Sequence, residues 1–185
     1  MCAYDEIFAR QNWRGCDPRA RRPTLRVRRR NACEPDMKPT IRPAVPADAP
    51  ALAEHNVAAA LETENLVLDP ATALAGVERV FRQPEFGRYF VAEIEGRIVA
   101  GLMITYEWRD WHNRVSWWIQ SVYTRPEFRR RGIYAALYRY VAELAHQAGV
   151  HSLRLYAEKD NRAAHAVYQN LGMKLGEYIL FEQKL

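Results

Sequence analysis

A basic, glycine-containing turn between a strand-like and a helix-like segment is the feature that most limits how this chain can fold. The apolar run 117–123 precedes Arg-Arg-Arg-Gly-Ile-Tyr at residues 129–134, and a stretch of strong helix formers follows at 135–144. The first N–H groups of a helix have no partner within it and together carry roughly half a positive charge, so they bind anions. The order of strand, turn and helix therefore predicts a phosphate or pyrophosphate site.

A second sequence pattern follows the helix-like segment. The alternating run 152–157 precedes Asn161, Ala164, Tyr168 and Gly172, which fit Asn-x-x-Ala-x-x-x-Tyr-x-x-x-Gly-(Phe/Met). Together with Arg-x-x-Gly-x-(Gly/Ala) from residue 129, this resembles the two signatures of the GNAT superfamily of N-acetyltransferases. The first signature is that family's coenzyme A pyrophosphate loop, and Tyr134 departs from it by replacing the usual small residue. The resemblance spans residues 40–185.

Hydrophobic periodicity and turn signals give the order of elements. Asp48 is expected to cap the first helix, the second helix is expected to follow Asp69-Pro70, and Glu95-Gly96 is a hairpin signal. The expected strands are 40–45, 89–94, 97–106, 114–124, 152–157 and 178–181, and the expected helices are 49–61, a segment after Pro70, 131–148 and 161–171. The order βααβββαβαβ predicts an α/β protein of the α+β type, with a mixed, mostly antiparallel twisted sheet flanked by helices. It is also the order of the GNAT fold.

The first 36 residues differ in composition from the rest. They contain nine arginines and all three cysteines but little apolar periodicity, so we expect a disordered Arg-rich extension before an acetyltransferase domain at 37–185. Translation starting at Met37, an Arg arm for nucleic acid or anionic surfaces, and a cleaved transit sequence are alternative interpretations. Five acidic residues argue against the last of them.

Composition also limits partners and location. No apolar run reaches the length of a membrane span and no secretory signal is visible, so we expect a cytoplasmic protein without membrane contact. The nearly neutral core argues against nucleic acid as a partner, and no cysteine has metal-ligand spacing, so no metal is expected. A monomer or homodimer is the expected state.

The resemblance implies where acetyl-CoA, the co-substrate, binds. In the family, the pantetheine arm lies between the strand before the loop and the strand after its helix. Backbone groups of Val122, Tyr123 and Thr124 would pair with it here, as a peptide adds to a sheet edge. The pyrophosphate would bind the loop residues Arg129, Arg130, Arg131, Gly132, Ile133 and Tyr134. Asn161 is a coenzyme ligand by resemblance and also a good helix N-cap, and both roles stay open.

The resemblance further implies that Tyr168 is the general acid that protonates the leaving thiolate; a tyrosine that only packs is the alternative. The acceptor amine must lose a proton, and Glu107 is the leading candidate for the base, ahead of Glu62, Glu64 and His112. Each of these groups is also explained as a solvated or substrate-positioning residue.

Four tryptophans lie within residues 108–118, and strand alternation places Trp117 and Trp118 on opposite faces. Trp108 with Glu62 and Glu64 is a hypothetical site for a cationic or aromatic amine, with core packing of the tryptophans as the alternative. The expected function is direct transfer of the acetyl group of acetyl-CoA to a primary amine of a small molecule or peptide. A non-catalytic, acyl-CoA-binding regulatory module is the alternative.

Overall fold

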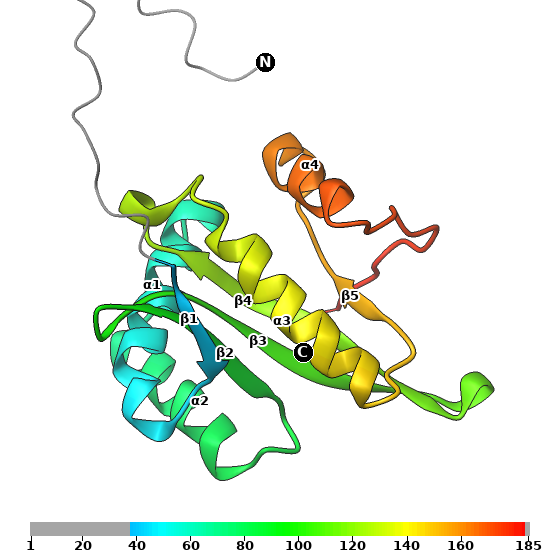
Figure 1. Ribbon diagram of the computed structural model, residues 1–185, viewed down its shortest axis with the longest axis horizontal. Helices are drawn as coiled ribbons and strands as arrows, with labels where there is room; N and C mark the ends of the chain where they lie inside the picture. Colours follow the sequence, from blue (N-terminus) through cyan, green and yellow to red (C-terminus); the bar gives the residue numbers. More distant parts are fainter. Residues whose placement is uncertain (1–37, 184–185) are drawn as a thin grey trace, which may run out of the picture. The chain divides into compact units, whose positions relative to one another are not determined.

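Five strands form one sheet in the order β1-β2-β3-β4-β5 in a computed structural model that describes residues 38–183 (Figure 1). The elements are β1 (Thr40–Pro43), α1 (Ala49–Glu64), α2 (Pro70–Arg82), β2 (Arg88–Ile94), β3 (Arg97–Arg109), β4 (Arg114–Thr124), α3 (Ile133–Gln147), β5 (Leu153–Leu155) and α4 (Arg162–Asn170). Short 3₁₀ helices lie at Pro46–Asp48, Asp110–His112 and Pro126–Phe128. The expected extension 1–36 lies outside the described residues.

The strand pairing confirms a mixed, mostly antiparallel sheet. Strands β1 to β4 pair antiparallel with their neighbours, whereas β4 and β5 are parallel and α3 connects them. At the hairpin between β2 and β3, Glu95 and Gly96 both have positive φ, at 51° and 75°. Two successive positive φ values are typical of a type I′ turn, whose twist matches that of the strands it joins. The Glu-Gly hairpin signal is therefore confirmed.

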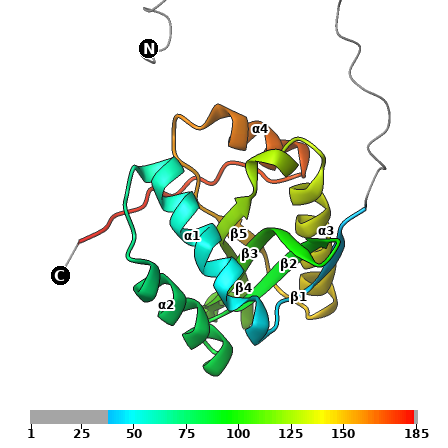
Figure 2. The same ribbon diagram turned by 90° about the vertical axis from the view of Figure 1, so that its left-hand side faces the viewer.

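Helices cover both faces of the sheet (Figure 2). On one face, which we call the α1 face, Leu52 of α1 and Val77 of α2 pack with Tyr89 and Val91 of β2. On the other, the α3 face, a second apolar cluster joins Phe90, Leu102, Ile104 and Ile119 of the sheet to Leu137 and Val141 of α3. Each fully buried side chain of this size contributes about 1.5–3 kcal/mol. Within residues 38–183, no helix is both long and apolar enough to span a membrane.

The aspartates that precede the first two helices behave differently, and the expected cap at Asp48 is wrong. Asp69 caps α2, because its side chain accepts a hydrogen bond from the Thr72 backbone N–H at 2.8 Å. Asp48 precedes α1 but makes no capping bond with its side chain. Its carboxylate instead pairs with both terminal nitrogens of Arg42, at 2.7 and 3.0 Å, and accepts from Val45 N–H. Two charge-assisted hydrogen bonds to Arg42 stabilise this position of the carboxylate more than one capping bond would. Asp48 therefore links β1 to the start of α1.

The expected last strand at 178–181 is wrong. No strand follows α4 in the part of the chain described, and Tyr178 and Phe181 are 87% and 89% exposed. Strand β5 has only three residues and pairs on one side with β4, so it offers a very short edge to a further strand. The residue types at 178–181 favour an extended backbone locally, but a strand also needs a neighbouring strand to pair with.

Candidate functional site

The sheet opens between β4 and β5. Strand β5 pairs with β4 only at Trp117, Trp118 and Ile119, whereas β4 continues to Thr124. A bulge at Ser121, which has φ 51°, shifts the β3–β4 register between Gln120 and Tyr123. Bulges bend a strand and increase its twist. After β5 the chain runs to α4, away from β4, so the last part of β4 has a free edge (Figure 1).

Alternation along β4 decides which backbone groups face this gap. Arg125 N–H donates to Val99 O of β3 at 2.9 Å, and an antiparallel strand turns every second residue toward the same neighbour. Tyr123 therefore also turns its backbone toward β3. Val122 and Thr124 turn theirs toward the gap, where the Thr124 carbonyl accepts from Arg129 Nε at 2.8 Å. Of the three residues expected to offer free backbone, two have the required orientation.

The basic turn leads from this free edge into α3. Gly132 is the residue before the helix and has φ 76°, and a Cβ atom at this position would meet nothing within 4 Å. The first hydrogen bond within the helix runs from Ala136 N–H to Gly132 O. The N–H groups of residues 133–135 therefore have no acceptor in the helix. Arg130 has a positive φ of 63°, a conformation that costs energy for any residue but glycine. Free helix N–H groups behind an uncrowded glycine are a suitable place for an anion to bind.

The three arginines of the turn differ in their surroundings. The Arg129 guanidinium pairs with Glu62, at the end of α1, and lies 5.4 Å from the centre of the Tyr123 ring. Glu62 also accepts from the Tyr123 hydroxyl at 3.1 Å. Arg131 lies 5.5 Å from the Phe128 ring, and Arg130 is exposed. Glu62, expected to bind the acceptor, therefore connects α1 to the basic turn.

The last two residues of the turn pack into the protein. Ile133 is 3% exposed and packs into the apolar core. The Tyr134 ring lies against Tyr168 of α4, with 6.0 Å between ring centres, and its hydroxyl is buried without a hydrogen-bond partner among residues 38–183. Burial raises the pKa of both phenols. Tyr168 is half-buried, and its raised pKa keeps the phenol protonated at neutral pH. A proton donor must be in this form.

Asn161 begins α4. Its side-chain oxygen accepts from the Ala164 backbone N–H at 3.0 Å, which confirms the expected cap. A role for Asn161 in holding the coenzyme stays a prediction.

A polar cluster occupies the α1 face beside the gap. Glu107 Oε2 accepts from Trp118 Nε1 at 2.7 Å and pairs with Arg154 Nη1 at 3.1 Å. The Arg154 guanidinium lies 5.4 Å from the centre of the Trp118 ring, which stacks on Tyr156 at 4.4 Å. Trp117 packs instead against the α3 cluster, so the expectation of opposite faces is confirmed. Sequence reasoning missed Arg154, although its place between two apolar leucines marked it as facing away from them.

The other expected acceptor residues do not gather here. Glu64 is exposed at the end of α1. Trp108 pairs with Val115 near the start of β4, eight residues from Tyr123, which at about 3.3 Å per residue is about 26 Å from the Glu62 contact. His112 stacks on His151 at that same distant end, with 4.1 Å between ring centres. The structure therefore separates Trp108 and His112 from the gap and from Glu62.

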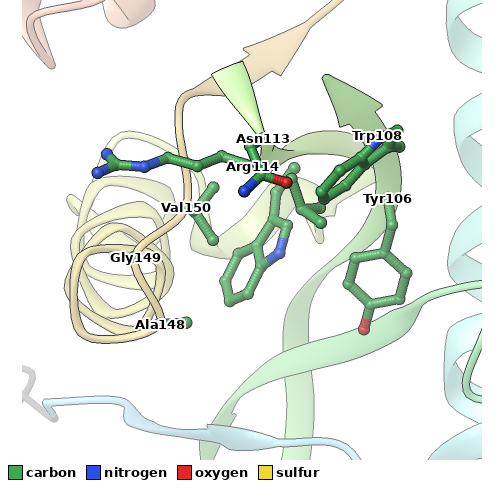
Figure 3. Close-up of a pocket in the computed structure, with 9 residues that line it drawn as sticks. Tyr106, Trp108, Asn113, Arg114, Ala148, Gly149 and Val150 are labelled. Carbon is green, nitrogen blue, oxygen red and sulfur yellow. The ribbon is translucent and has the colours of Figure 1, made fainter. Parts of the chain in front are cut away.

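A hollow of about 440 Å³ lies beside Trp108 (Figure 3). Trp108, Trp117 and the backbone around Gly149, after the end of α3, line it. The hollow lies at the C-terminal end of α3, whereas Gly132 precedes the N-terminal end. The hollow is therefore separate from the basic turn. Within residues 38–183, no three His, Cys, Asp or Glu side chains lie together in a way that could hold a metal ion.

Comparison with known proteins agrees with this geometry. The model of the Acetyltransferase (GNAT) family matches residues 57–173. A possible acetyltransferase from Clostridium difficile 630 is 36% identical, with a TM-score of 0.75 over 80% of this chain and 98% of that one. A putative acetyltransferase from Agrobacterium tumefaciens C58 is 25% identical, with a TM-score of 0.67 over 78% and 99%.

An aminoglycoside acetyltransferase from an uncultured soil metagenomic sample, solved with trehalose, is 18% identical and shares the fold, with a TM-score of 0.67 over 80% and 96% of the two chains. No curated protein matches the chain. The family model covers more than half of the sequence, and its range includes the gap, the anion-binding turn and α4. The chain belongs to the GNAT family of acetyltransferases.

Proposed function

We propose that this enzyme transfers the acetyl group of acetyl-CoA directly to a primary amine of a small molecule or peptide. The observation that carries the proposal is the continuity of the free β4 edge with the turn at Gly132, because one extended coenzyme can use both. Backbone groups that face a gap can pair with an amide-bearing arm, and free helix N–H groups can hold a pyrophosphate at the end of that arm.

The residues that would hold acetyl-CoA follow from these orientations. Val122 and Thr124 would pair with the pantetheine arm, and the N–H groups at the start of α3 would bind the pyrophosphate. Arg130, which is exposed, supplies positive charge at the turn, whereas Arg129 is already paired with Glu62. The thioester supplies an activated acetyl group, and the residues around it need only position the amine and move protons.

Tyr168 is our proposed general acid. As the amine nitrogen forms its bond to the acetyl carbon, the carbon–sulfur bond breaks and the leaving sulfur needs a proton. Burial raises the pKa of Tyr168, so the phenol holds its proton until a basic thiolate develops nearby. Its place on α4, against Tyr134 at the start of α3, sets it near the coenzyme turn.

Glu107 is our proposed acceptor of the amine proton, directly or through water. Oxygen Oε2 is occupied by Trp118 Nε1 and Arg154 Nη1, while Oε1 makes only a longer contact with Arg154, at 3.4 Å. One carboxylate oxygen is therefore available to an ammonium group. The side chain is 37% exposed, which leaves room for an acceptor or a water.

The proposal is tested with the full chain by calorimetry with acetyl-CoA, followed by measuring free-thiol release against a panel of amines. We expect micromolar binding and amine-dependent thiol release. Binding without release with every amine would support a regulatory acyl-CoA-binding module instead. Absence of binding would refute the placement of the coenzyme turn at Gly132.

A further inference from the structure

Four side chains on the α1 face form what we call the Arg154 cluster: Glu107, Trp118, Arg154 and Tyr156. We propose that this cluster selects acceptor amines that also carry a carboxylate, such as amino acids or short peptides. The inference rests on the proposed acetyl transfer and adds the substrate class. It is carried by the position of the cluster, by its arrangement of charge and by its aromatic surface.

The cluster borders the gap. Arg154 is opposite Trp118 in the β4–β5 ladder, and the next pair, Ile119 and Leu155, is the last before the strands separate. Val122, the first residue proposed to pair with the coenzyme, is four positions beyond Trp118. At about 3.3 Å per residue this is about 13 Å, a length that a bound amino acid or dipeptide and the two flanking side chains can span.

Arg154 retains hydrogen-bonding capacity. Only its Nη1 contacts Glu107, and within residues 38–183 its Nε and Nη2 have no partner. The side chain is 27% exposed, so its guanidinium is partly shielded from water but accessible. A planar guanidinium with two unused donors matches a carboxylate in two-pronged geometry, more closely than an ammonium would.

Glu107 supplies the opposite charge beside it. Its Oε2 accepts from both Trp118 and Arg154, and Oε1 is the oxygen left for an ammonium group. A receptor for an anion and a receptor for a cation therefore lie side by side. A zwitterionic acceptor satisfies both, whereas a diamine or polyamine would bring a second positive charge to Arg154, where like charges repel.

The aromatic pair provides a surface for the rest of the acceptor. Trp118 and Tyr156 stack with 4.4 Å between ring centres and an interplanar angle of 25°, and Tyr156 is 58% exposed. Trp118 is fixed from two sides, by its bond to Glu107 and by the Arg154 guanidinium over its ring. A held aromatic surface of this kind suits an apolar side chain or the plane of a peptide group.

The experiment compares acceptors that differ only in the carboxylate, using the full chain and thiol release. The pairs are a dipeptide with its C-terminal amide, and lysine with cadaverine. We expect kcat/KM to be about tenfold to a hundredfold higher for the carboxylate member, mainly through KM, which is the usual size of a hydrogen bond to a charged group. Arg154→Gln should remove this preference, so that kcat/KM for the carboxylate member falls to about the value for its partner without the carboxylate.

Controls separate recognition from folding. Arg154→Lys should keep part of the preference, and Arg82→Gln, which removes an exposed arginine paired with Glu78 on α2, should keep all of it. If Arg154→Gln does not fold, calorimetry of the wild-type protein bound to coenzyme A decides the question. Tighter binding of the dipeptide than of its amide supports the assignment, and equal binding overturns it.

Other outcomes also decide. Equal kcat/KM for both members of each pair, or an Arg154→Gln variant that slows both members equally, would overturn the assignment of Arg154. Release with amides and diamines alone would overturn the substrate class while leaving acetyl transfer established. Binding of acetyl-CoA without release with any amine would overturn both the proposed function and this inference.

Discussion

Acid should destabilise this protein through His55. The side chain is 2% exposed on α1, and neither ring nitrogen has a hydrogen-bond partner among residues 38–183. It packs against the Tyr123 ring, with 4.9 Å between ring centres. Burial, reinforced by the charge of Arg125, lowers the pKa of His55 from its ordinary 6.5 to about 4. The neutral imidazole is therefore the folded form over the whole physiological range.

The magnitude follows from the two pKa values. In the unfolded chain His55 becomes protonated below about pH 6.5, whereas in the folded chain it stays neutral down to about pH 4. Protonation therefore stabilises the unfolded state, and unfolding becomes more favourable as the pH falls. At 1.36 kcal/mol per pKa unit, the loss is about 2 kcal/mol at pH 5 and about 3 kcal/mol at pH 4, and it is absent above pH 7. This is a large share of the stability of a typical domain.

Urea unfolding followed by tryptophan fluorescence at pH 7.5 and pH 5.0 tests this. The free energy of unfolding of the wild type should fall between these two values by about 2 kcal/mol more than that of His55→Leu. Any effect of leucine on packing is present at both pH values and cancels in the comparison. His146→Gln, which removes an exposed histidine of α3, should lose as much as the wild type. The same loss in wild type and His55→Leu would refute the argument.

Three further predictions concern the coenzyme turn, the proposed acid and a helix cap. Gly132→Glu should abolish acetyl-CoA binding in calorimetry because its carboxylate repels the pyrophosphate. The control Gly149→Glu places a glutamate at a similar positive φ of 67°, after the C-terminal end of α3, and should bind acetyl-CoA normally. Tyr168→Phe should lower kcat by about tenfold to a hundredfold in thiol-release assays with an unchanged Kd for acetyl-CoA, and a wild-type kcat would leave Tyr168 a packing residue. Asp69→Ala should reduce the urea-unfolding free energy by about 1 kcal/mol through loss of the α2 cap, and no reduction would refute that role.

The sequence predicts best what depends on neighbours along the chain. The hairpin at Glu95 and Gly96, the start of a helix after Asp69 and the glycine-containing turn before α3 are all confirmed, because each depends on a few adjacent residues. The opposite faces of Trp117 and Trp118 follow from the strict alternation of a strand. A periodic pattern therefore gives the element and the direction of its side chains, which here sufficed for the fold class.

Contacts between distant segments are where sequence reasoning fails. Glu62 and Arg129 are 67 positions apart, and no local pattern indicates that they pair. Glu107 meets Arg154 only because β3, β4 and β5 lie side by side in one register. The strand expected at 178–181 fails for the same reason, since a strand requires an edge supplied by another part of the chain.

Tyr134 illustrates how a departure from a family signature is resolved by geometry. The signature expects a small residue there, and a side chain directed into the turn would occupy the space of the phosphates. Gly132, however, supplies the positive φ, 76°, at the position directly before α3. Tyr134 follows within the first turn of α3, and its ring lies between α3 and α4, against Tyr138 and Tyr168. The bulky residue therefore leaves the anion-binding backbone accessible and adds a contact that helps to hold the proposed general acid in place.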